Sequence, residues 1–452
     1  MATREMVASP EVLKSASVSS TSASYISPLA ILTTLFFMWG FITSLNDILV
    51  PHLKSIFDLN YTHVMLVQFA FFSAYFFFSI PWSKVVNRIG YQKAMVVGLL
   101  TIGVGSAMFV PAAYATSFPL FLTALLILAA GITGLQVAAN PYVLVLGKPE
   151  TASSRLNLTQ AFNSLGTTLA PALGGMFILS AAPLAAEQLR QLSPHALHVY
   201  RMNQAASIKM PYIVISIALI LLALAIAKSK LPTIAHEEAR PGEKIKDSIW
   251  KHPNLLFGAL GIFAYVSAEV SIGSFMVNYL GQPEIAGFSP KIAAGYVSFY
   301  WGGAMVGRFI GAAVLQKIKT GHLLAICAVC TATFVTFSIL TTGHLAMWSM
   351  IAVGFFNSIM FPSIFALGVA ELGPLTGTGS GLMNMAIVGG AIIPVLQGAI
   401  ADHIGIHHAF LLPVICYLYI LFYALRGSMP NSERHGNGKE KFAREMGHAT
   451  SW

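Results

Sequence analysis

The sequence predicts an all-α membrane protein with twelve transmembrane helices in two parallel six-helix halves. The first observation is composition: 56% of the 452 residues are hydrophobic and only 10% are charged, whereas soluble proteins carry about 25% charged residues. The second is that apolar runs of span length recur along the whole chain. Such runs fit helices of about 20 residues and not the alternating strands of a membrane β-barrel. The third is an internal repeat with a period of six spans.

A charged loop divides the predicted spans into two sets of six. This loop, K-S-K-L-P-T-I-A-H-E-E-A-R-P-G-E-K-I-K-D, follows the sixth span. We expect a disordered cytoplasmic tail at 1–26, an N-terminal half at 27–229, a cytoplasmic linker at 230–252, a C-terminal half at 253–427 and a cytoplasmic tail at 428–452. The predicted spans are 27–52, 62–86, 93–113, 118–146, 155–180, 209–229, 253–281, 290–315, 321–342, 345–370, 377–402 and 407–427.

The basic residues indicate the orientation of the chain. With a cytoplasmic N-terminus, the inside segments carry twenty lysines and arginines and the outside segments carry five. Because positive charge is retained on the cytoplasmic side, both termini and the central loop are expected to be cytoplasmic. The net charge of +9 does not indicate a nucleic-acid partner, since the basic residues are spread over short loops.

The two halves repeat the same spacing of amides, glycines and prolines. An amide precedes a proline by five residues in the fourth and tenth spans, and a glycine precedes a proline by five residues in the fifth and eleventh. The pairs are Gln136 with Pro141, Asn357 with Pro362, Gly166 with Pro171, and Gly389 with Pro394. Repeats of parallel topology are typical of the major facilitator superfamily, so the chain resembles that superfamily in its plan.

A loop after the second span strengthens this resemblance. It reads P-W-S-K-V-V-N-R-I-G-Y-Q-K and is similar to the G-x-x-x-D-R-x-G-R-K loop of superfamily members. Asn87 stands where that pattern has an acid, and Arg88 follows it. The resemblance implies that the loop acts in the conformational change, with a weaker charge lock. Arg308, the sole basic residue away from the ends of a predicted span, is assigned either to this loop-locking role or to transport.

Two carboxylates lie well inside predicted spans, namely Asp47 and Glu269. Glu371 and Asp402 are placed at cytoplasmic span ends. Ionisable residues inside the membrane commonly face a partner or a water-filled cavity and mark pathways for ions or protons. We therefore predict that Asp47 and Glu269 couple a cation to transport; a structural hydrogen bond or a position near a helix end is the alternative for each.

Eight amides in the predicted spans suggest a polar cavity. They are Asn46, Gln136, Asn140, Gln160, Asn163, Asn278, Asn357 and Asn384. One or two amides could serve as hydrogen-bonded glue between helices, but eight of them suit a polyol, whose hydroxyl groups both donate and accept. Trp39, Tyr265, Phe299, Tyr300 and Trp301 could stack on a sugar ring, although packing is the more common role for an aromatic side chain. We predict no catalytic set, no metal site and no cofactor besides the coupling ion.

Three long motifs resemble the fucose:proton symporter family of the major facilitator superfamily. They are W-G-F-I-T-S-L-N-D-I-L-V-P-H-L, A-A-N-P-Y-V-L-V-L-G and R-L-N-L-T-Q-A-F-N-S-L-G, and the similarity extends over residues 28 to 426, nearest to the bacterial glucose/galactose branch. That branch also takes in N-acetylglucosamine transporters. The fucose branch uses an aspartate that Asp47 matches and a fourth-span glutamate that Gln136 replaces. Glu269 stands where the fucose branch has a glutamine.

The resemblance implies a symporter that imports glucose and galactose with protons or sodium ions, as a monomer in the inner membrane of a bacterium. N-acetylglucosamine and fucose are alternative substrates. A proton-coupled exporter of drugs or metabolites is the alternative function. An enzyme would need a clustered catalytic set, and a sugar sensor would usually carry a longer cytoplasmic extension.

Overall fold

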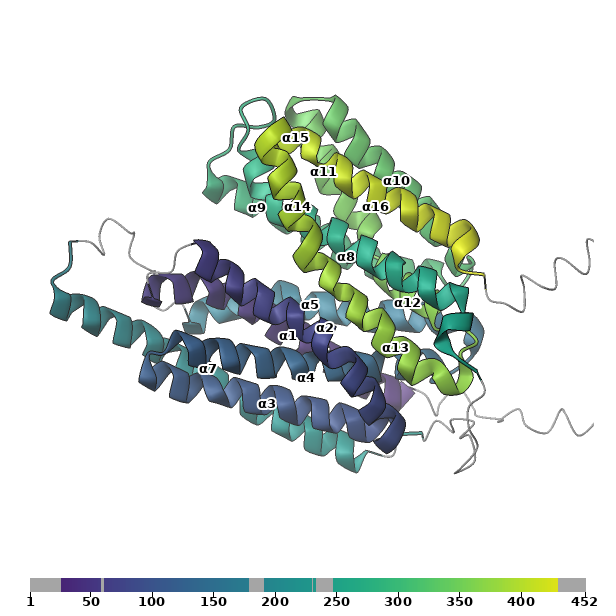
Figure 1. Ribbon diagram of the computed structural model, residues 1–452, viewed down its shortest axis with the longest axis horizontal. Coiled ribbons are helices and arrows are strands. Elements are labelled where there is room, and N and C mark those ends of the chain that lie inside the picture. The colour runs from purple at the N-terminus through teal and green to yellow at the C-terminus, as the bar shows by residue number, and fades with distance from the viewer. Residues whose placement is uncertain (1–25, 58–60, 179–190, 230, 233–246, 430–452) are drawn as a thin grey trace, which may run out of the picture.

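The computed structural model describes residues 26–57, 61–178, 191–229, 231–232 and 247–429. In these residues the regular structure consists of helices, which form two groups inclined to one another (Figure 1). Most of the predicted tails, most of the linker and residues 179–190, which begin the segment between the fifth and sixth predicted spans, lie outside the described residues.

Six long helices form the N-terminal group. They are α1 (Ile26–Phe57), α2 (Tyr61–Ile89), α3 (Tyr91–Ala115), α4 (Phe118–Val145), α5 (Ala152–Ile178) and α7 (Pro194–Lys228). The turn between α2 and α3 needs a glycine, because Gly90 has a φ of 82°, a conformation that side chains with a Cβ rarely adopt. Arg155 of α5 donates hydrogen bonds to the carbonyl oxygens of Val143 and Leu144, which caps the C-terminal end of α4.

The C-terminal group contains both continuous and interrupted helices. The continuous ones are α8 (Pro253–Leu280), α9 (Pro290–Val314) and α10 (Thr320–Leu340). The interrupted segments are α11 (Gly343–Asn357) with α12 (Met360–Gly368), α13 (Thr376–Met385) with α14 (Gly389–Ile404), and α15 (Ile406–Ala409) with α16 (Leu411–Phe422) and a π-helical turn at Tyr423–Gly427. Pro362 and Pro394 lie near two of the interruptions, and proline removes a backbone donor from a helix.

Ten of these segments are long and apolar enough to cross a membrane. The two others of span length, α5 and α9, are more polar. Together they give twelve span-length segments in the described residues, as the sequence predicted. The two most polar spans pack against each other, although they belong to different groups, so polarity is concentrated where the two groups meet.

The internal repeat corresponds to equivalent helix contacts. In the N-terminal group, a Cβ at Gly166 of α5 would overlap the backbone oxygen of Phe37 on α1. In the C-terminal group, a Cβ at Gly389 of α14 would overlap the backbone oxygen of Phe263 on α8. The fifth helix of each group therefore approaches the first helix closely enough to require glycine.

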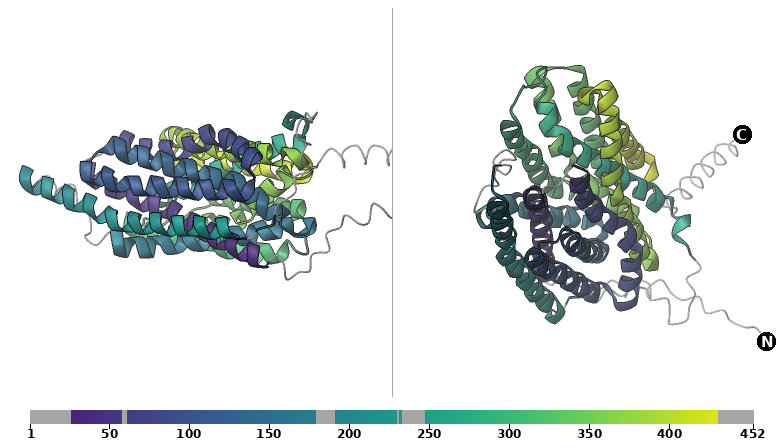
Figure 2. Two further views of the ribbon diagram at one scale, coloured as in Figure 1. Left: turned by 90° about the horizontal axis from the view of Figure 1, so that it is seen from below. Right: turned by 60° about the vertical axis from the view of Figure 1, so that its left-hand side comes forward.

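The two groups are joined by hydrogen bonds near one end of the molecule. Ser154 donates to the backbone oxygen of Ala312 at 2.6 Å, and Thr320 donates to Ser153 at 2.8 Å. Figure 1 shows the helices of the two groups converging toward this end, where α8 begins, and diverging toward the other end. Two further views of the same helices are given in Figure 2, with the N-terminal group in purple to teal and the C-terminal group in green to yellow.

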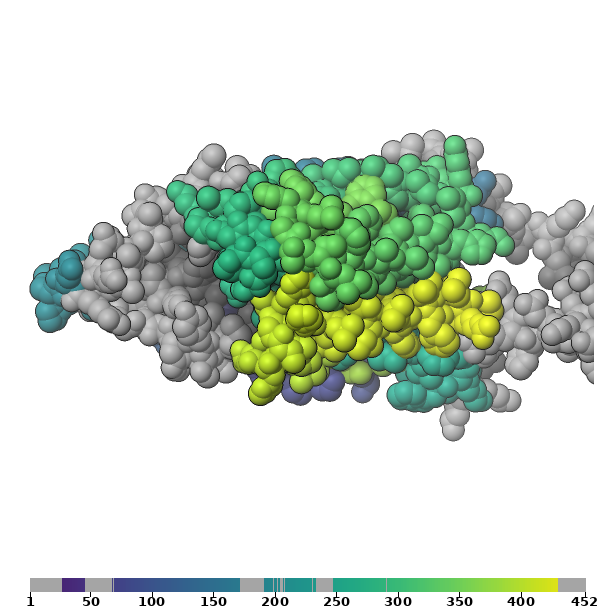
Figure 3. All heavy atoms as spheres, turned by 90° about the horizontal axis from the view of Figure 1, so that it is seen from above, coloured from purple at the N-terminus to yellow at the C-terminus, as the bar shows by residue number. Residues whose placement is uncertain are grey.

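The C-terminal group covers one broad face of the protein. In the space-filling view of Figure 3, green and yellow atoms of this group fill the face, and little of the N-terminal group is visible below them. Large apolar side chains such as Phe299, Leu340 and Leu418 are exposed on the C-terminal helices, as expected for surfaces that contact lipid.

Candidate functional site

A buried ion pair lies in the interior of the C-terminal group. The Oε1 atom of Glu269, on α8, is 3.8 Å from Nη2 of Arg308, on α9, and both side chains are about 15% exposed. The hydroxyl of Tyr265, one turn earlier on α8, donates to the same carboxylate oxygen at 2.6 Å. Glu269 is thus held in place by a cation and a hydrogen-bond donor, a pattern that lets a charge persist away from water.

Arg308 reaches three helices. Its Nε donates to the backbone oxygen of Ser358 at 3.1 Å, where the break between α11 and α12 leaves that carbonyl outside the regular helical pattern. Its Nη1 donates to Oγ of Ser164 on α5, in the other helix group. The guanidinium therefore connects Glu269, the α11–α12 break and the N-terminal group through the fixed donor geometry of arginine.

The two repeated amides form equivalent bonds with tyrosines. Gln136 on α4 donates to the hydroxyl of Tyr75 on α2 at 2.7 Å, and Asn357 on α11 donates to the hydroxyl of Tyr300 on α9 at 2.9 Å. Each bond joins the fourth span of a group to the second span of the same group. The sequence repeat therefore encodes a repeated amide–tyrosine pair, one on each side of the molecular interior.

Three other predicted amides are buried near the N-terminal repeat. Asn163 on α5 donates to the backbone oxygen of Phe36 on α1 at 3.0 Å, and Gln160 makes a long 3.5 Å contact with Oδ1 of Asn140. Nδ2 of Asn140 has no hydrogen-bond partner among the described residues. Because buried polar groups are normally satisfied, this donor is available to water or to a ligand.

Asn384 on α13 resembles Asn140 in having unused hydrogen-bonding capacity. Its Nδ2 donates to the backbone oxygen of Ser380 at 2.9 Å, and within the described part of the chain its Oδ1, like Oδ1 of Asn357, lacks a partner. Both side chains are fully buried. These acceptors complement the free donor of Asn140, so the N-terminal group offers a free donor and the C-terminal group offers free acceptors.

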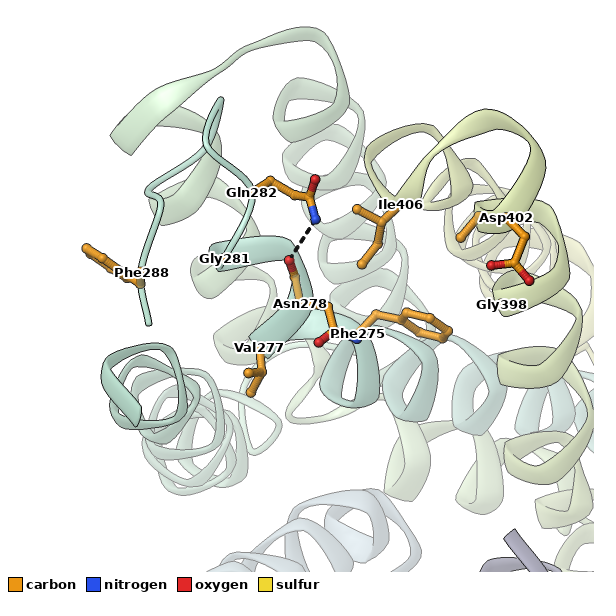
Figure 4. Close-up of a pocket in the computed structure, with 10 residues that line it drawn as sticks. Phe275, Val277, Asn278, Gly281, Gln282, Phe288, Gly398, Asp402 and Ile406 are labelled. Carbon is orange, nitrogen blue, oxygen red and sulfur yellow. Dashed lines mark hydrogen bonds between the residues drawn. The ribbon is translucent and has the colours of Figure 1, made fainter. Parts of the chain in front are cut away.

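Asn278 lies apart from the other amides, at a cavity of about 630 Å³ (Figure 4). The cavity is lined by the C-terminal end of α8, by Gln282 and Phe288 in the loop that follows, and by Asp402 of α14. Asn278 lies nine residues beyond Glu269, which is about 13 Å along a helix. Its backbone oxygen accepts a hydrogen bond from Nε2 of Gln282 at 3.2 Å.

The position of Asp402 corrects one expectation from the sequence. Asp402 was expected at a cytoplasmic span end, together with Glu371. The structure places Asp402 beside the C-terminal end of α8, whereas Glu371 follows α12, a segment antiparallel to α14. The two acids therefore lie at opposite ends of the helix bundle, because successive spans run in opposite directions.

Two groups of predicted residues remain. Asn46 and Asp47 belong to α1, but their side chains lie outside the described residues. Asn87, near the C-terminal end of α2, donates to Oγ1 of Thr378 on α13 at 3.1 Å, and Arg88 is exposed next to it. The partners of Arg308 lie within the helix bundle and not in the loop after α2. Its contacts therefore differ from the loop-locking contacts that the sequence analysis considered.

The predicted stacking aromatics divide into two classes. Trp39, Tyr265 and Tyr300 are buried, and the two tyrosines are used through their hydroxyl groups. Phe299 is 57% exposed and Trp301 is 43% exposed. The sequence analysis considered only the aromatic rings and missed the hydroxyl groups. Tyr265 and Glu269 are four residues apart, about one helical turn, and this spacing could have indicated the hydrogen bond between them.

Sequence reasoning also missed Tyr75, Ser164 and Ser358. Serine and tyrosine are common in spans, so nothing in the local pattern distinguishes these three from packing residues. The described residues contain no cluster of three or more potential metal ligands. The arrangement of buried amides, hydroxyls and one ion pair is suited to reversible binding of a polar solute, and it offers no activated nucleophile.

The sequence profile of the Major Facilitator Superfamily matches residues 31–393. The glucose/galactose transporter of Brucella abortus is 52% identical over 90% of this chain and 96% of its own. The putative glucose/galactose transporter of Helicobacter pylori strain J99 is 45% identical over 88% and 95%. The L-fucose-proton symporter of Escherichia coli K12 is 33% identical over 89% and 93%.

The fold comparison agrees with the sequence comparison. The crystal structure of the fucose:proton symporter FucP in the outward conformation matches with a TM-score of 0.82 and 32% identity, over 90% of this chain and all of that one. The chain is thus a multi-pass membrane transporter rather than an enzyme. On its sequence, its twelve-span fold and these relatives, it belongs to the Major Facilitator Superfamily and, within it, to the fucose:proton symporter family.

Proposed function

We propose that this protein is a cation-coupled symporter that imports hexoses, glucose and galactose above all, by alternating access. The observation that carries the proposal is a set of buried amides with an unused donor in the N-terminal group and unused acceptors in the C-terminal group, together with the largely buried carboxylate of Glu269. The names of two relatives, the glucose/galactose transporter of Brucella abortus and the putative glucose/galactose transporter of Helicobacter pylori, support the choice of substrate.

The amides suit a hexose because each sugar hydroxyl can donate and accept at once. Nδ2 of Asn140 supplies a free donor, and Oδ1 of Asn357 and Oδ1 of Asn384 supply free acceptors. Gln136, Gln160 and Asn163 lie among the same helices and complete the proposed binding region, with Asn46 on α1. A site built to hydrogen-bond hydroxyls discriminates strongly against analogues that lack them.

Asp47 and Glu269 are the proposed coupling carboxylates. Transfer of a charged cation across the membrane needs a group that can be neutralised, and carboxylates inside spans commonly serve this purpose. Gln136 stands at the position where the fucose branch carries a glutamate, so the acid of the C-terminal group, Glu269, takes its place. A proton or a sodium ion would serve.

The proposed orientation has both termini and the linker in the cytoplasm of a bacterium, with the protein in the inner membrane. In that orientation the hydrogen bonds Ser154–Ala312 and Thr320–Ser153 close the cytoplasmic end. The cavity at Asn278 then lies at the outer end of the C-terminal group. Asn278 would be the first amide that an incoming sugar meets, and the transporter would work as a monomer.

The test is uptake into proteoliposomes of the purified protein. Glucose, galactose, fucose and N-acetylglucosamine are each supplied under an imposed proton gradient, a sodium gradient or no gradient. We expect glucose and galactose to accumulate under one cation gradient. Accumulation of only fucose or N-acetylglucosamine would change the substrate, and a failure of every sugar to accumulate would refute symport.

Single variants test the binding region in the same vesicles. Replacement of Gln136, Asn163 or Asn357 by alanine should raise the sugar KM, whereas replacement of the exposed amide Asn203 on α7 should not. Loss of a single hydrogen bond of this kind is worth about 0.5–1.5 kcal/mol, or about two- to tenfold in KM. An unchanged KM in all three variants would place the sugar elsewhere.

A further inference from the structure

Arg308 contacts both Glu269, the proposed coupling carboxylate of the C-terminal half, and the N-terminal half of the protein. Its guanidinium contacts Glu269 on α8, the carbonyl of Ser358 and the hydroxyl of Ser164 on α5. Ser164 belongs to the N-terminal group and the other two belong to the C-terminal group.

In this conformation Arg308 occupies the place of a coupling cation. A guanidinium 3.8 Å from Glu269 already balances its charge, and it would repel a second cation at the same carboxylate. A proton or sodium ion that binds Glu269 would leave Arg308 as a buried charge without a counter-ion, which is costly. The remaining titratable groups described around Glu269 are Tyr265, Tyr300 and Tyr417, and none of them is an anion at neutral pH. Arg308 must therefore move when a cation binds.

Movement of Arg308 would change the contact surface between α5 and α9, which is called the seam below. Along this seam the ring of Phe162 meets that of Phe309, with centroids 5.8 Å apart, and Thr168 contacts the sulfur of Met305 at 3.6 Å. Ser164 lies between these contacts in the sequence of α5 and bonds to Arg308. The guanidinium is thus inserted into an inter-half contact surface and is not confined to one half.

We propose that Arg308 is an internal cation that competes with the coupling ion for Glu269 and links the occupancy of Glu269 to the α5–α9 seam. With Arg308 on Glu269 and Ser164, the seam is closed, as observed. A cation at Glu269 displaces Arg308, Arg308 leaves Ser164, and the seam weakens, so the halves can separate at that end. This inference rests on the proposed coupling role of Glu269. Arg308 acts as a positioning residue and needs no contact with the sugar.

The first experiment measures the seam directly by disulfide formation. Ser153→Cys and Thr320→Cys are combined in a protein whose native cysteines, Cys327, Cys330 and Cys416, are replaced by alanine. The two hydroxyl oxygens are 2.8 Å apart, so the introduced thiols should oxidise rapidly when the seam is closed. In this background, Arg308→Gln should lower the rate about tenfold, because the two thiols then meet in a much smaller fraction of the molecules.

Matched variants separate the proposal from a general loss of structure. Lys291→Gln removes a positive charge from the exposed start of the same helix and should leave the rate unchanged. Ser164→Ala removes the inter-half partner but keeps the Glu269 pair, and it should lower the rate severalfold. If Arg308→Gln does not fold, Arg308→Lys takes its place. Lysine keeps the positive charge but loses the several N–H donors of the guanidinium group, so the rate of disulfide formation should lie between those of wild type and of an open seam. A wild-type rate in Arg308→Gln, or in both Arg308→Lys and Ser164→Ala, would overturn the proposal.

The second experiment uses transport. Counterflow exchanges labelled for unlabelled sugar without a cation gradient, whereas accumulation needs coupling. Arg308→Gln should keep counterflow within about threefold of wild type and lose accumulation by tenfold or more. Equal losses of both activities would indicate a structural role and contradict the proposal. If wild-type protein fails to accumulate sugar, the proposed function fails, and the disulfide assay still tests the effect of Arg308 on the seam.

Discussion

Replacement of Glu269 by glutamine should destabilise the protein more than the combined replacement of Glu269 and Arg308. At 3.8 Å and an effective dielectric constant of about 20, the Coulomb attraction of the pair is about 4 kcal/mol. Arg308 can keep its bond to the backbone oxygen of Ser358 in the variant, which compensates part of this loss. We therefore expect Glu269→Gln alone to cost about 2–4 kcal/mol, near the usual cost of breaking a buried pair.

The double variant Glu269→Gln/Arg308→Gln should recover most of this stability, because it leaves no uncompensated buried charge. Its cost should be about 1 kcal/mol, so the coupling energy in the double-mutant cycle should exceed about 2 kcal/mol.

The assay is the thermal unfolding midpoint of the four proteins in detergent. For a unit the size of one six-helix half, each kcal/mol lowers the midpoint by about 2–4 °C, so Glu269→Gln should lose about 4 °C or more. Lys291→Gln again serves as the charge control. Additive effects of the two single variants would show that the carboxylate and the guanidinium do not stabilise one another, and the reasoning about the pair would then fail.

Three further predictions concern other parts of the molecule. Asn87→Ala removes the bond to Thr378 and should slow disulfide formation in the seam assay about two- to fivefold, the value of one exposed neutral hydrogen bond; an unchanged rate would exclude a role in closure. Gly166→Leu should prevent close packing of α5 on α1 and lower the yield of folded protein, whereas Gly295→Leu, which meets open space, should be tolerated; equal yields by size-exclusion chromatography would contradict this. Asn278→Ala should raise the KM for uptake by about threefold and leave the maximal rate unchanged, and a changed maximal rate alone would remove it from the entry path.

The sequence predicted the fold well because the bilayer allows few structures. Span length follows from the thickness of the bilayer and from the need to satisfy every backbone polar group within a helix, and the six-span repeat indicates the division into two halves. The repeat also predicted equivalent positions, and Gln136 and Asn357 do form equivalent bonds to Tyr75 and Tyr300. Here the repeated spacing along the sequence was sufficient to predict equivalent positions, because equivalent helices of the two halves have equivalent neighbours.

The site was less predictable because its contacts join distant helices. Arg308 is 144 residues from Ser164 and 50 residues from Ser358, and no local spacing indicates either contact. The carbonyl of Ser358 has no helical donor because the residue four positions later, Pro362, lacks a backbone N–H, but nothing local indicates which side chain donates to it instead. Asn278 was grouped with the other amides because it lies inside an apolar predicted span, although the position of a residue along a span decides which part of the transport path it meets.

The polarity of α5 and α9 is suited to a seam that opens and closes in each transport cycle. An apolar seam would resemble a protein core, and separating it in each cycle would expose a large apolar surface at high cost. Hydrogen bonds such as Ser154–Ala312 and Thr320–Ser153 can be exchanged for bonds to water with a small net change in free energy. Their weakness makes the closed seam reversible, so the stability of the closed state must come from a few stronger contacts that can be switched. Arg308 provides such a contact, because its bond to Ser164 depends on a guanidinium whose position is determined by the charge of Glu269. The two least apolar spans are therefore the ones in which a binding event can be converted into movement of the halves.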